Sequence, residues 1–329
     1  MSSNRFFWFL IILFFIQASH SKADRNHLGF GFDNQKETVT IPFKSFNNLI
    51  ILESVIDNEN TLNLILDTGI RSLVLFDKSY IPKVSDKTFD IRFTGAGMEE
   101  PISAEVSINH NLRLCDDVVA NQINAVILKR SNDYLHTLKG IKIHGVFGYQ
   151  LFSRFRVEID YENQFLTLSE PYKTDKIEGF EAIPISILDT KPFVTTHIST
   201  KENEWQKLSL LLDIGANHKI LLLNNPNPSH KKMRNRRIAE GLSASIYGSK
   251  TFAKTVRLGS VIYSDTEILI PTKTTYHHES IDIEKHGAIG GRLFEKSTII
   301  LDYINGYLFV EKQGDQIRPS SGFLAEGQF

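Results

Sequence analysis

Two short stretches of the sequence each place an aspartate and a glycine directly after an apolar run. Residues 64–69 read Leu-Ile-Leu-Asp-Thr-Gly, and residues 210–215 read Leu-Leu-Leu-Asp-Ile-Gly. A carboxylate at the end of a buried strand is costly unless it is hydrogen-bonded or functional, and glycine lets the backbone turn sharply beside it. One such triplet is weak evidence, but the second copy, 146 residues later, makes Asp67 and Asp213 a candidate catalytic pair.

The chemistry of such a pair follows from the cost of placing two negative charges together. Two carboxylates at close range cannot both be ionised cheaply, so they share one proton. One carboxylate can then take a proton from water while the other gives a proton to a carbonyl oxygen. This is general acid–base hydrolysis of a peptide bond without a covalent intermediate.

Two further motifs are repeated in the same order as the aspartates. Residues 145–152 (Gly-Val-Phe-Gly-Tyr-Gln-Leu-Phe) match residues 287–294 (Gly-Ala-Ile-Gly-Gly-Arg-Leu-Phe), and residues 157–163 match residues 299–305. Both matches have an offset of 142 without a gap. The repeat therefore predicts two equivalent lobes, joined near residues 171–179 and related by a pseudo-two-fold axis that brings Asp67 and Asp213 face to face.

Short alternating runs between turn residues predict an all-β protein with few short helices. Expected strands include residues 37–43, 49–55, 89–93, 102–108, 118–128, 157–160 and 165–168. We expect a short helix at residues 132–138, a helical turn at 151–155 and a loose lead-in at 23–36. The predicted domains are a signal peptide (1–23), an N-terminal lobe (24–175), a C-terminal lobe (176–313) and a polar tail (314–329).

Composition excludes some classes of partner. The 329 residues include 37 basic and 38 acidic ones, so no bulk charge attracts nucleic acid or anionic membranes. A basic run at residues 231–237 lacks interleaved aromatic residues and is interpreted as solvated. The single cysteine, Cys115, cannot form an intrachain disulfide and is expected to be a buried small hydrophobe.

The N-terminus is typical of an export signal. Arg5 precedes 11 apolar residues from Phe6 to Ile16, and small residues follow up to Ala23. This run is short for a bilayer span, which favours cleavage after Ser21 or Ala23 over an uncleaved membrane anchor. The expected location is the periplasm, the cell envelope or the exterior.

The remaining acids and histidines receive structural interpretations. Asp160 and Asp302 each precede a tyrosine at a strand-to-turn junction, where aspartate is favoured. His218 is expected at the surface or beside a substrate. His277, His278 and His286 do not match the ligand spacing of a metal site, so no metal or other cofactor is expected.

Taken together, these motifs resemble two-lobed, retropepsin-like and pepsin-like aspartyl proteases of the type exported by Bacteroidota, without their C-terminal PDZ domain. The likeness covers nearly all of the predicted mature chain. It is carried in the first lobe by residues 41–43, 47–50, 65–69, 145–152 and 159–161. In the second lobe it is carried by residues 191–193, 211–216, 287–294 and 301–303.

The resemblance implies a bilobed aspartic-protease fold, a polypeptide substrate and action as a monomer. Asp67 and Asp213 would be catalytic. Loop support would come from Thr68, Gly69, Ile214, Gly215 and Ala216. The apolar-apolar-Gly elements packed behind the loops would be Val146, Phe147 and Gly148, and Ala288, Ile289 and Gly290. The flap over the cleft would be the hairpin tip with Gly95, Ala96 and Gly97.

The second loop departs from the family pattern. A threonine or serine normally follows each aspartate and ties the two loops together, and Thr68 fits this pattern whereas Ile214 has no hydroxyl. Ile70 also occupies a position that is usually small. A catalytic pair displaced by about 1 Å can lose roughly a hundredfold in rate. Three functions therefore remain open: an endopeptidase, a catalytically silent peptide-binding module, or two half-domains with a purely structural role at the cell surface and no cleft between the lobes.

Overall fold

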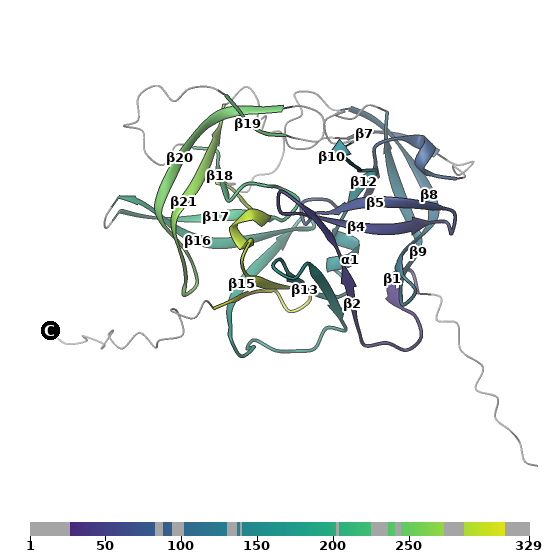
Figure 1. Cartoon of the computed structure of the whole chain (residues 1–329), viewed down its shortest axis with the longest axis horizontal. Helices are drawn as coiled ribbons and strands as arrows, with labels where there is room; N and C mark the ends of the chain where they lie inside the picture. The colour runs from purple at the N-terminus through teal and green to yellow at the C-terminus, as the bar shows by residue number, and fades with distance from the viewer. Residues whose placement is uncertain are drawn as a thin grey trace, which may run out of the picture.

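The computed structural model describes residues 27–82, 88–93, 102–129, 137–138, 140–201, 204–224, 236–240, 245–272 and 286–312. Within these ranges the regular structure is almost all strand, arranged as two lobes side by side (Figure 1). The described helices are one α-helix, α1 (Tyr149–Phe152), and two short 3-10 helices, η1 (Lys78–Tyr80) and η4 (Gly291–Phe294). No helix in these ranges has the length and apolar character needed to cross a membrane.

Six strands of the first lobe close on themselves in the order β9-β6-β12-β5-β4-β8, and β8 pairs back to β9. Strand β1 adds to β9, β7 to β8 and β3 to β4. The strands are β1 (Gly29–Phe32), β3 (Lys44–Phe46), β4 (Leu49–Ile56), β5 (Asn60–Leu66), β6 (Leu73–Leu75), β7 (Thr88–Phe93), β8 (Ile102–Cys115), β9 (Val118–Leu128) and β12 (Gly145–Phe147). A small separate pair contains β10 (Thr137–Leu138) and β11 (Ile141–Lys142).

The second lobe repeats the closed arrangement, in the order β21-β18-β22-β17-β16-β20, and β20 pairs with both β21 and β16. Strand β19 adds to β20. The strands are β16 (Lys191–Lys201), β17 (Glu204–Asp213), β18 (Ile220–Leu222), β19 (Arg236–Glu240), β20 (Ser245–Leu258), β21 (Val261–Pro271) and β22 (Gly287–Gly290). The two barrel-like lobes therefore have the same topology, as the sequence repeat predicts.

One sheet joins the two lobes, in the order β15-β24-β23-β13-β14-β2. Its strands are β2 (Thr38–Pro42), β13 (Arg156–Asp160), β14 (Phe165–Ser169), β15 (Phe180–Leu188), β23 (Thr298–Asp302) and β24 (Tyr307–Glu311). At its centre β13 pairs antiparallel with β23, and Glu158 lies opposite Ile300, its own counterpart in the repeat. The pseudo-two-fold axis therefore passes through this pair.

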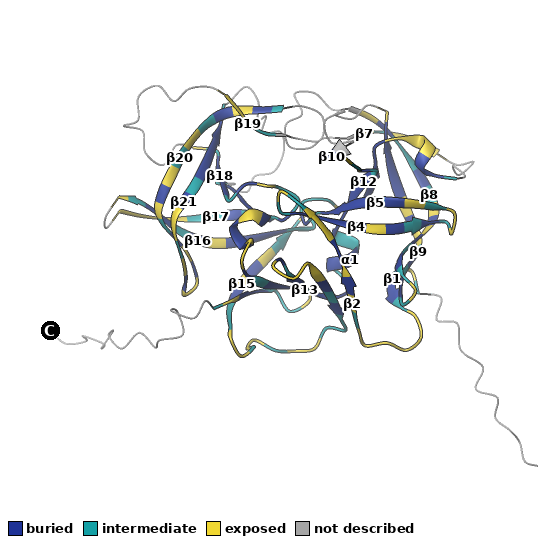
Figure 2. Ribbon diagram, in the orientation of Figure 1, coloured by how far each residue is buried: buried dark blue, intermediate teal, exposed yellow. Residues whose placement is uncertain are grey.

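Apolar side chains from both lobes and the shared sheet form one continuous buried cluster. The inner faces of the strands are buried and the outer faces exposed (Figure 2). Strand β9, for example, carries buried and exposed residues in near alternation before ending in four buried residues. Such alternation places one face of each strand on the core, and this burial is the main stabilising contribution to the fold.

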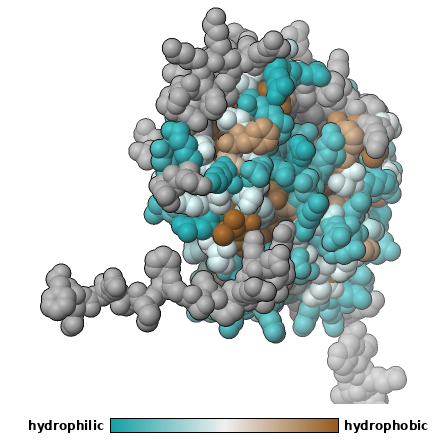
Figure 3. All heavy atoms as spheres, turned by 60° about the vertical axis from the view of Figure 1, so that its left-hand side comes forward, coloured by the Kyte–Doolittle hydropathy of each residue, from teal (hydrophilic) through white to brown (hydrophobic). Residues whose placement is uncertain are grey.

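The outer surface of the second lobe is largely hydrophilic, with separate apolar spots (Figure 3). Large exposed hydrophobic residues on its sheet include Trp205, Phe252 and Ile262. Two of them are covered by cations: the guanidinium of Arg257 lies 5.1 Å from the Trp205 ring, and Lys250 Nζ lies 5.5 Å from the Phe252 ring. These contacts reduce the apolar surface that meets water.

Two local predictions from the sequence need correction. Residues 23–36 were expected to be a loose lead-in, but β1 pairs antiparallel with β9 over Gly29–Phe32, and Phe30 is buried. A helix was expected at 132–138, but its last two residues form β10 and pair with β11. Residues 132–136 lie outside the described residues. In both places long-range strand pairing decides the structure, and local sequence preference does not.

Candidate active site

Asp67 follows the last residue of β5, which runs through the centre of the first lobe. Strand β12 lies parallel to β5, with Val146 opposite Ile65 and Phe147 opposite Leu66. The backbone N–H of Asp67 donates to Phe147 O over 2.9 Å. Gly148 then passes so close that a Cβ there would lie 1.7 Å from Asp67 O. The apolar-apolar-Gly element thus holds the backbone of Asp67 in place. Only glycine fits at its third position, Gly148.

The second lobe builds the same support around Asp213, the last residue of β17. Strand β22 lies parallel to β17, with Ile289 opposite Leu212 and Gly290 opposite Asp213. A Cβ at Gly290 would lie 2.2 Å from His218 O. The repeated sequence motif therefore corresponds to a repeated strand pairing, with glycine again at the close approach.

The carboxyl groups of Asp67 and Asp213 meet between the lobes and share a hydrogen bond. Each also accepts a hydrogen bond from the backbone of the glycine two residues later; the N–H of Gly69 lies 2.6 Å from Asp67 Oδ1, and Gly215 does the same for Asp213. A Cβ at Gly215 would lie only 2.3 Å from Asp67 Cγ. Glycine at 215 is therefore what lets the opposite carboxyl approach.

The surroundings of the pair raise the pKa of both carboxyls. For Asp67 the cause is burial. For Asp213 burial comes first and the negative charge of Asp67 second, so its pKa lies well above the usual range. Both residues nevertheless keep part of their surface open to solvent. A pair of this kind shares one proton over a range of pH and can be reached by water, which is what water activation requires.

Thr68 links the two loops from a fully buried position. Its Oγ1 donates to Leu212 O over 2.6 Å and accepts from the N–H of Ile214 over 3.0 Å, both in the opposite lobe. Ile214, its counterpart, is also fully buried but has no hydroxyl to offer in return. The side-chain link between the loops is therefore made from one side only.

Backbone contacts behind the loops are nevertheless symmetric. The N–H of Tyr149 donates to Ile70 O, and in the second lobe the N–H of Gly291 donates to Ala216 O; both distances are 3.0 Å. The backbone oxygen of Ile70 thus takes the same role as that of Ala216, although its side chain is larger. Asn48 adds a contact between the lobes, since its Nδ2 donates to Gly291 O over 2.6 Å.

Two tyrosines that lie beneath the loops were given no role at the site by the sequence patterns. Tyr161 and Tyr303 follow the repeated Asp160 and Asp302, and the hydroxyl oxygen of each is buried without a hydrogen-bond partner among the described residues. Burial raises the pKa of Tyr161 and raises that of Tyr303 further, and the charge of Asp67 adds to the effect at Tyr303. The signal that could have revealed them is the repeated Asp-Tyr motif, which was assigned to turn chemistry alone.

That turn chemistry is nevertheless present in both copies. Asp160 accepts from the backbone N–H of Asn163 over 2.9 Å and from its Nδ2 over 2.8 Å. Asp302 makes the same two contacts with Asn305 at the same distances. These two carboxylates therefore hold turns at the ends of β13 and β23.

Among the histidines, His218 corrects an expectation. It was predicted at the surface or beside a substrate, but it is buried, and its Nε2 has no partner among the described residues. Burial lowers the pKa of His218 to about 4. His286 Nδ1 instead lies 3.1 Å from the N–H of Ser209, and His144 Nδ1 lies 2.8 Å from the N–H of Asn63. These last two histidines support the strands that lead to the aspartates.

Several predicted features lie outside the described residues, namely the flap candidates Gly95, Ala96 and Gly97, and His277 and His278. Cys115 is partly buried and packs against the core. Within the described ranges no group of three or more histidine, cysteine, aspartate or glutamate residues is arranged to hold a metal ion.

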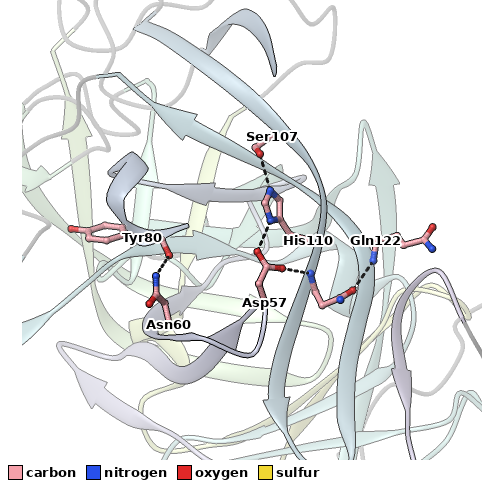
Figure 4. Close-up of polar contacts among 7 residues, drawn as sticks. Asp57, Asn60, Tyr80, Ser107, His110 and Gln122 are labelled. Carbon is pink, nitrogen blue, oxygen red and sulfur yellow. Dashed lines mark hydrogen bonds and ion pairs between the residues drawn. The ribbon is translucent and has the colours of Figure 1, made fainter. Parts of the chain in front are cut away.

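A second cluster of chemically reactive side chains lies in the first lobe, between the turn after β4 and strand β8 (Figure 4). His110 contacts Asp57 Oδ2 through Nδ1 and Ser107 Oγ through Nε2, both over 2.8 Å, and Asp57 Oδ1 accepts from the N–H of Asn111. Although this is the order of a serine-nucleophile triad, Ser107 is 0% exposed and His110 2% exposed. No substrate can reach this serine, so the cluster ties the turn after β4 to the irregular pairing of β8 with β9.

Comparison with known proteins adds support for the fold. No family model matches the chain, and no curated protein matches it in sequence. The crystal structure of an aspartic proteinase from Irpex lacteus is similar to this chain with a TM-score of 0.51 and 11% sequence identity, covering 85% of this chain and 98% of that one. At this identity the likeness concerns the fold alone.

The class of fold is now defined by three observations: two closed lobes of equal topology, a sheet shared across the pseudo-two-fold axis, and a solved structure of similar shape. The protein has the bilobed, pepsin-like aspartic-protease fold. Its two Asp-x-Gly loops meet where the lobes face each other.

Proposed function

We propose that the protein is an aspartic-type endopeptidase that hydrolyses peptide bonds with a water activated between Asp67 and Asp213. The observation that carries the proposal is the hydrogen-bonded contact of these two carboxyls in a site open to solvent. The likeness of fold to an aspartic proteinase supports the same reaction class.

In the proposed reaction the pair holds one proton and one negative charge. The ionised carboxylate takes a proton from water, and the protonated carboxyl donates to the oxygen of the scissile carbonyl. The backbone N–H groups of Gly69 and Gly215 hold the two carboxyls in place through the hydrogen bonds described above. Because both acids come from one chain, the proposed enzyme acts as a monomer on a polypeptide substrate and needs no metal or other cofactor.

A peptide library tests the proposal with wild type, Asp67→Asn and Asp213→Asn across acidic to neutral pH. Cleavage by the wild type should fall by roughly 10² to 10⁴ in each variant, the usual contribution of general acid–base catalysis. Asp116→Asn is a matched control because it removes an exposed carboxylate elsewhere in the first lobe. Equal cleavage by all four proteins would refute the endopeptidase proposal.

The second candidate function is a catalytically silent module that holds a peptide in the cleft of a protease fold. Ile214 favours it, because the one-sided link between the loops gives less rigidity to the pair. If this candidate is right, the wild type binds peptides without cleaving them, and Ile214→Thr restores the second hydroxyl and gains cleavage. Failure to bind any peptide would count against the module.

We further propose that the protein is exported, and that it is of the retropepsin-like type found in exported Bacteroidota proteins. The support is the apolar run from Phe6 to Ile16 followed by small residues. N-terminal sequencing of the protein recovered from an exporting host tests the first point. A new N-terminus after Ser21 or Ala23 indicates signal cleavage, an intact N-terminus in the membrane fraction indicates an anchor, and an intact N-terminus in the cytoplasm contradicts export.

A further inference from the structure

Two tight turns, one from each lobe, reach across toward the opposite lobe. Asn47 and Asn48 connect β3 to β4 with φ of 48° and 66°, and Asp189 and Thr190 connect β15 to β16 with φ of 45° and 69°. The second turn lies 142 residues after the first, at the offset of the repeat. The two turns are therefore equivalent elements of the two lobes.

Each turn is held against the other lobe by a polar contact near the active-site loops. In the first lobe the contact is made by Asn48, whose Nδ2 donates to Gly291 O. In the second lobe Asp189 Oδ1 lies 2.7 Å from Nη2 of Arg71, which comes from the loop that carries Asp67. The turn before β16 is thus attached directly to the loop of one catalytic candidate.

The residue that follows each turn differs between the lobes. In the first lobe it is Leu49, which is buried with 7% of its surface exposed. In the second lobe it is Lys191, which is partly buried. Among the described residues its ammonium group makes no hydrogen bond and no ion pair within 4.0 Å of a carboxylate.

Lys191 begins β16 and Asp213 ends β17, and these strands pair antiparallel with Phe193 opposite Leu211. Because side chains alternate along a strand, continuing this register by two residues places Lys191 beside Asp213 on the same face, and its charge acts on the aspartate pair. It lowers the pKa of both Asp67 and Asp213 and so opposes the effect of burial. The hydroxyl of Tyr303 also lies in electrostatic contact with both carboxyls, and burial raises its pKa well above the ordinary value, so it adds no charge at ordinary pH. Arg71, the other nearby cation, is paired with Asp189. Within the described residues, Lys191 is therefore the unpaired cation that faces the pair.

We propose that Lys191 is a positioning residue of the Asp67–Asp213 pair, placed by the β15–β16 turn so that its charge stabilises the form with one ionised carboxylate. With a leucine at this position, as in the first lobe, the ionised carboxylate of the pair would be destabilised by burial and would have no nearby lysine charge to stabilise it. The pair therefore reaches its singly ionised form at lower pH than a site built from two identical lobes. The catalytic consequence rests on the proposed function, whereas the effect on the carboxyls does not.

The test replaces Lys191 by the residue of the other lobe. In Lys191→Leu, ¹³C NMR titration of labelled aspartate carboxyls should show both steps of the pair at higher pH than in wild type. The signals of the pair are assigned by their absence in Asp67→Asn and Asp213→Asn. Lys191→Arg keeps the positive charge and should titrate like the wild type. If the protein cleaves peptides, the acidic limb of kcat/KM against pH should move in the same direction as the NMR titration.

Lys207→Met supplies a matched control, since it removes one exposed lysine from β17, the strand that leads to Asp213. It should leave the titration of the pair unchanged. An unchanged titration in Lys191→Leu, or an equal change in Lys207→Met, would overturn the proposal. Lys191→Gln, with a polar side chain, gives the same comparison if the leucine variant does not fold. Absence of peptide cleavage by the wild type, together with a shifted titration in Lys191→Leu, would contradict the endopeptidase while leaving the role of Lys191 intact.

Discussion

Thr68 and Ile214 occupy equivalent positions in the two repeats, yet only Thr68 binds the opposite lobe through its side chain. Its hydroxyl donates a hydrogen bond to Leu212 O and accepts one from the N–H of Ile214. Both residues are fully buried, so neither loop can replace the missing contact with exposed water at this point. The junction of the loops therefore depends heavily on one hydroxyl.

Thr68→Val tests this dependence, because valine keeps the shape and removes the hydroxyl. Leu212 O and the N–H of Ile214 would then be buried without their partner, and each such group costs about 1–3 kcal/mol. We expect the free energy of unfolding to fall by roughly 2–4 kcal/mol, measured by urea denaturation. Thr40→Val removes an exposed hydroxyl that contacts Thr167 Oγ1 and should change stability by less than about 0.5 kcal/mol. Equal losses in the two variants would contradict the role of Thr68.

The buried His218 predicts a loss of stability in mild acid. Its pKa is about 4 in the folded protein, whereas an unfolded histidine titrates near 6.5. The unfolded state therefore binds more protons between these values, and stability falls as pH decreases from about 6.5 to about 4, by roughly 3 kcal/mol in all. His218→Gln should flatten this part of the stability curve. The pKa of His197, on β16, is also lowered, first by partial burial and then by the charges of Arg257 and Lys207, so His197→Gln should flatten the curve much less than His218→Gln. A slope that survives in His218→Gln would exclude His218 as its source.

For the Asp67–Asp213 pair we expect stability to depend on pH in the direction opposite to that caused by His218. Because the pKa of Asp213 is raised in the folded protein, the folded state binds more protons than the unfolded state, and stability falls as pH rises from about 3.8 toward the folded value. At pH 7 the wild type therefore carries the cost of a buried negative charge. Asp213→Asn should raise the melting temperature at pH 7 by a few degrees, and less at pH 4. The exposed-site control Asp116→Asn should not, and a lower melting temperature in Asp213→Asn would contradict the prediction.

Gly148 predicts a strong steric effect behind the first loop. A methyl group there would lie 1.7 Å from Asp67 O, a contact that only a backbone shift can relieve. We expect Gly148→Ala to cost at least about 3 kcal/mol, toward the upper end for single substitutions, and to weaken any activity of Asp67. Gly29→Ala is the comparison, since a Cβ there meets nothing within 4 Å although its φ is +74°. A Gly148→Ala protein as stable as Gly29→Ala would show that the loop can move freely.

Sequence patterns predicted much of this architecture because the relevant signals are local or repeated. The expected strand at residues 118–128 coincides with β9, since its alternation continues over many residues. The 142-residue repeat predicted two equivalent lobes, and the resemblance to aspartyl proteases implied that an apolar-apolar-Gly element packs behind each aspartate loop. In the structure β12 lies parallel to β5 and β22 lies parallel to β17. Repetition carries long-range information that a single motif lacks.

Other features could not be predicted because they arise only when distant strands meet. Strand β1 is only four residues long, and two of them are glycines, so it shows no alternation of apolar and polar side chains from which a strand could be predicted. His218 has no local signal for burial, which comes from packing beside β22. The cluster of Asp57, Ser107 and His110 depends on irregular pairing between β8 and β9. Lys191 looks like an ordinary strand residue until the shared turn geometry identifies Leu49 as its counterpart.

The sheet that joins the lobes also contributes non-covalent contacts that keep the two lobes associated. The covalent connection between β14 and β15 runs through an exposed segment that includes Tyr172, whereas β13 and β23 pair along four residues across the axis. A single cut in the connection would leave these backbone hydrogen bonds and the Thr68 contacts intact. The protein should therefore survive as a nicked two-fragment complex, and separately produced halves should complement each other by completing one sheet.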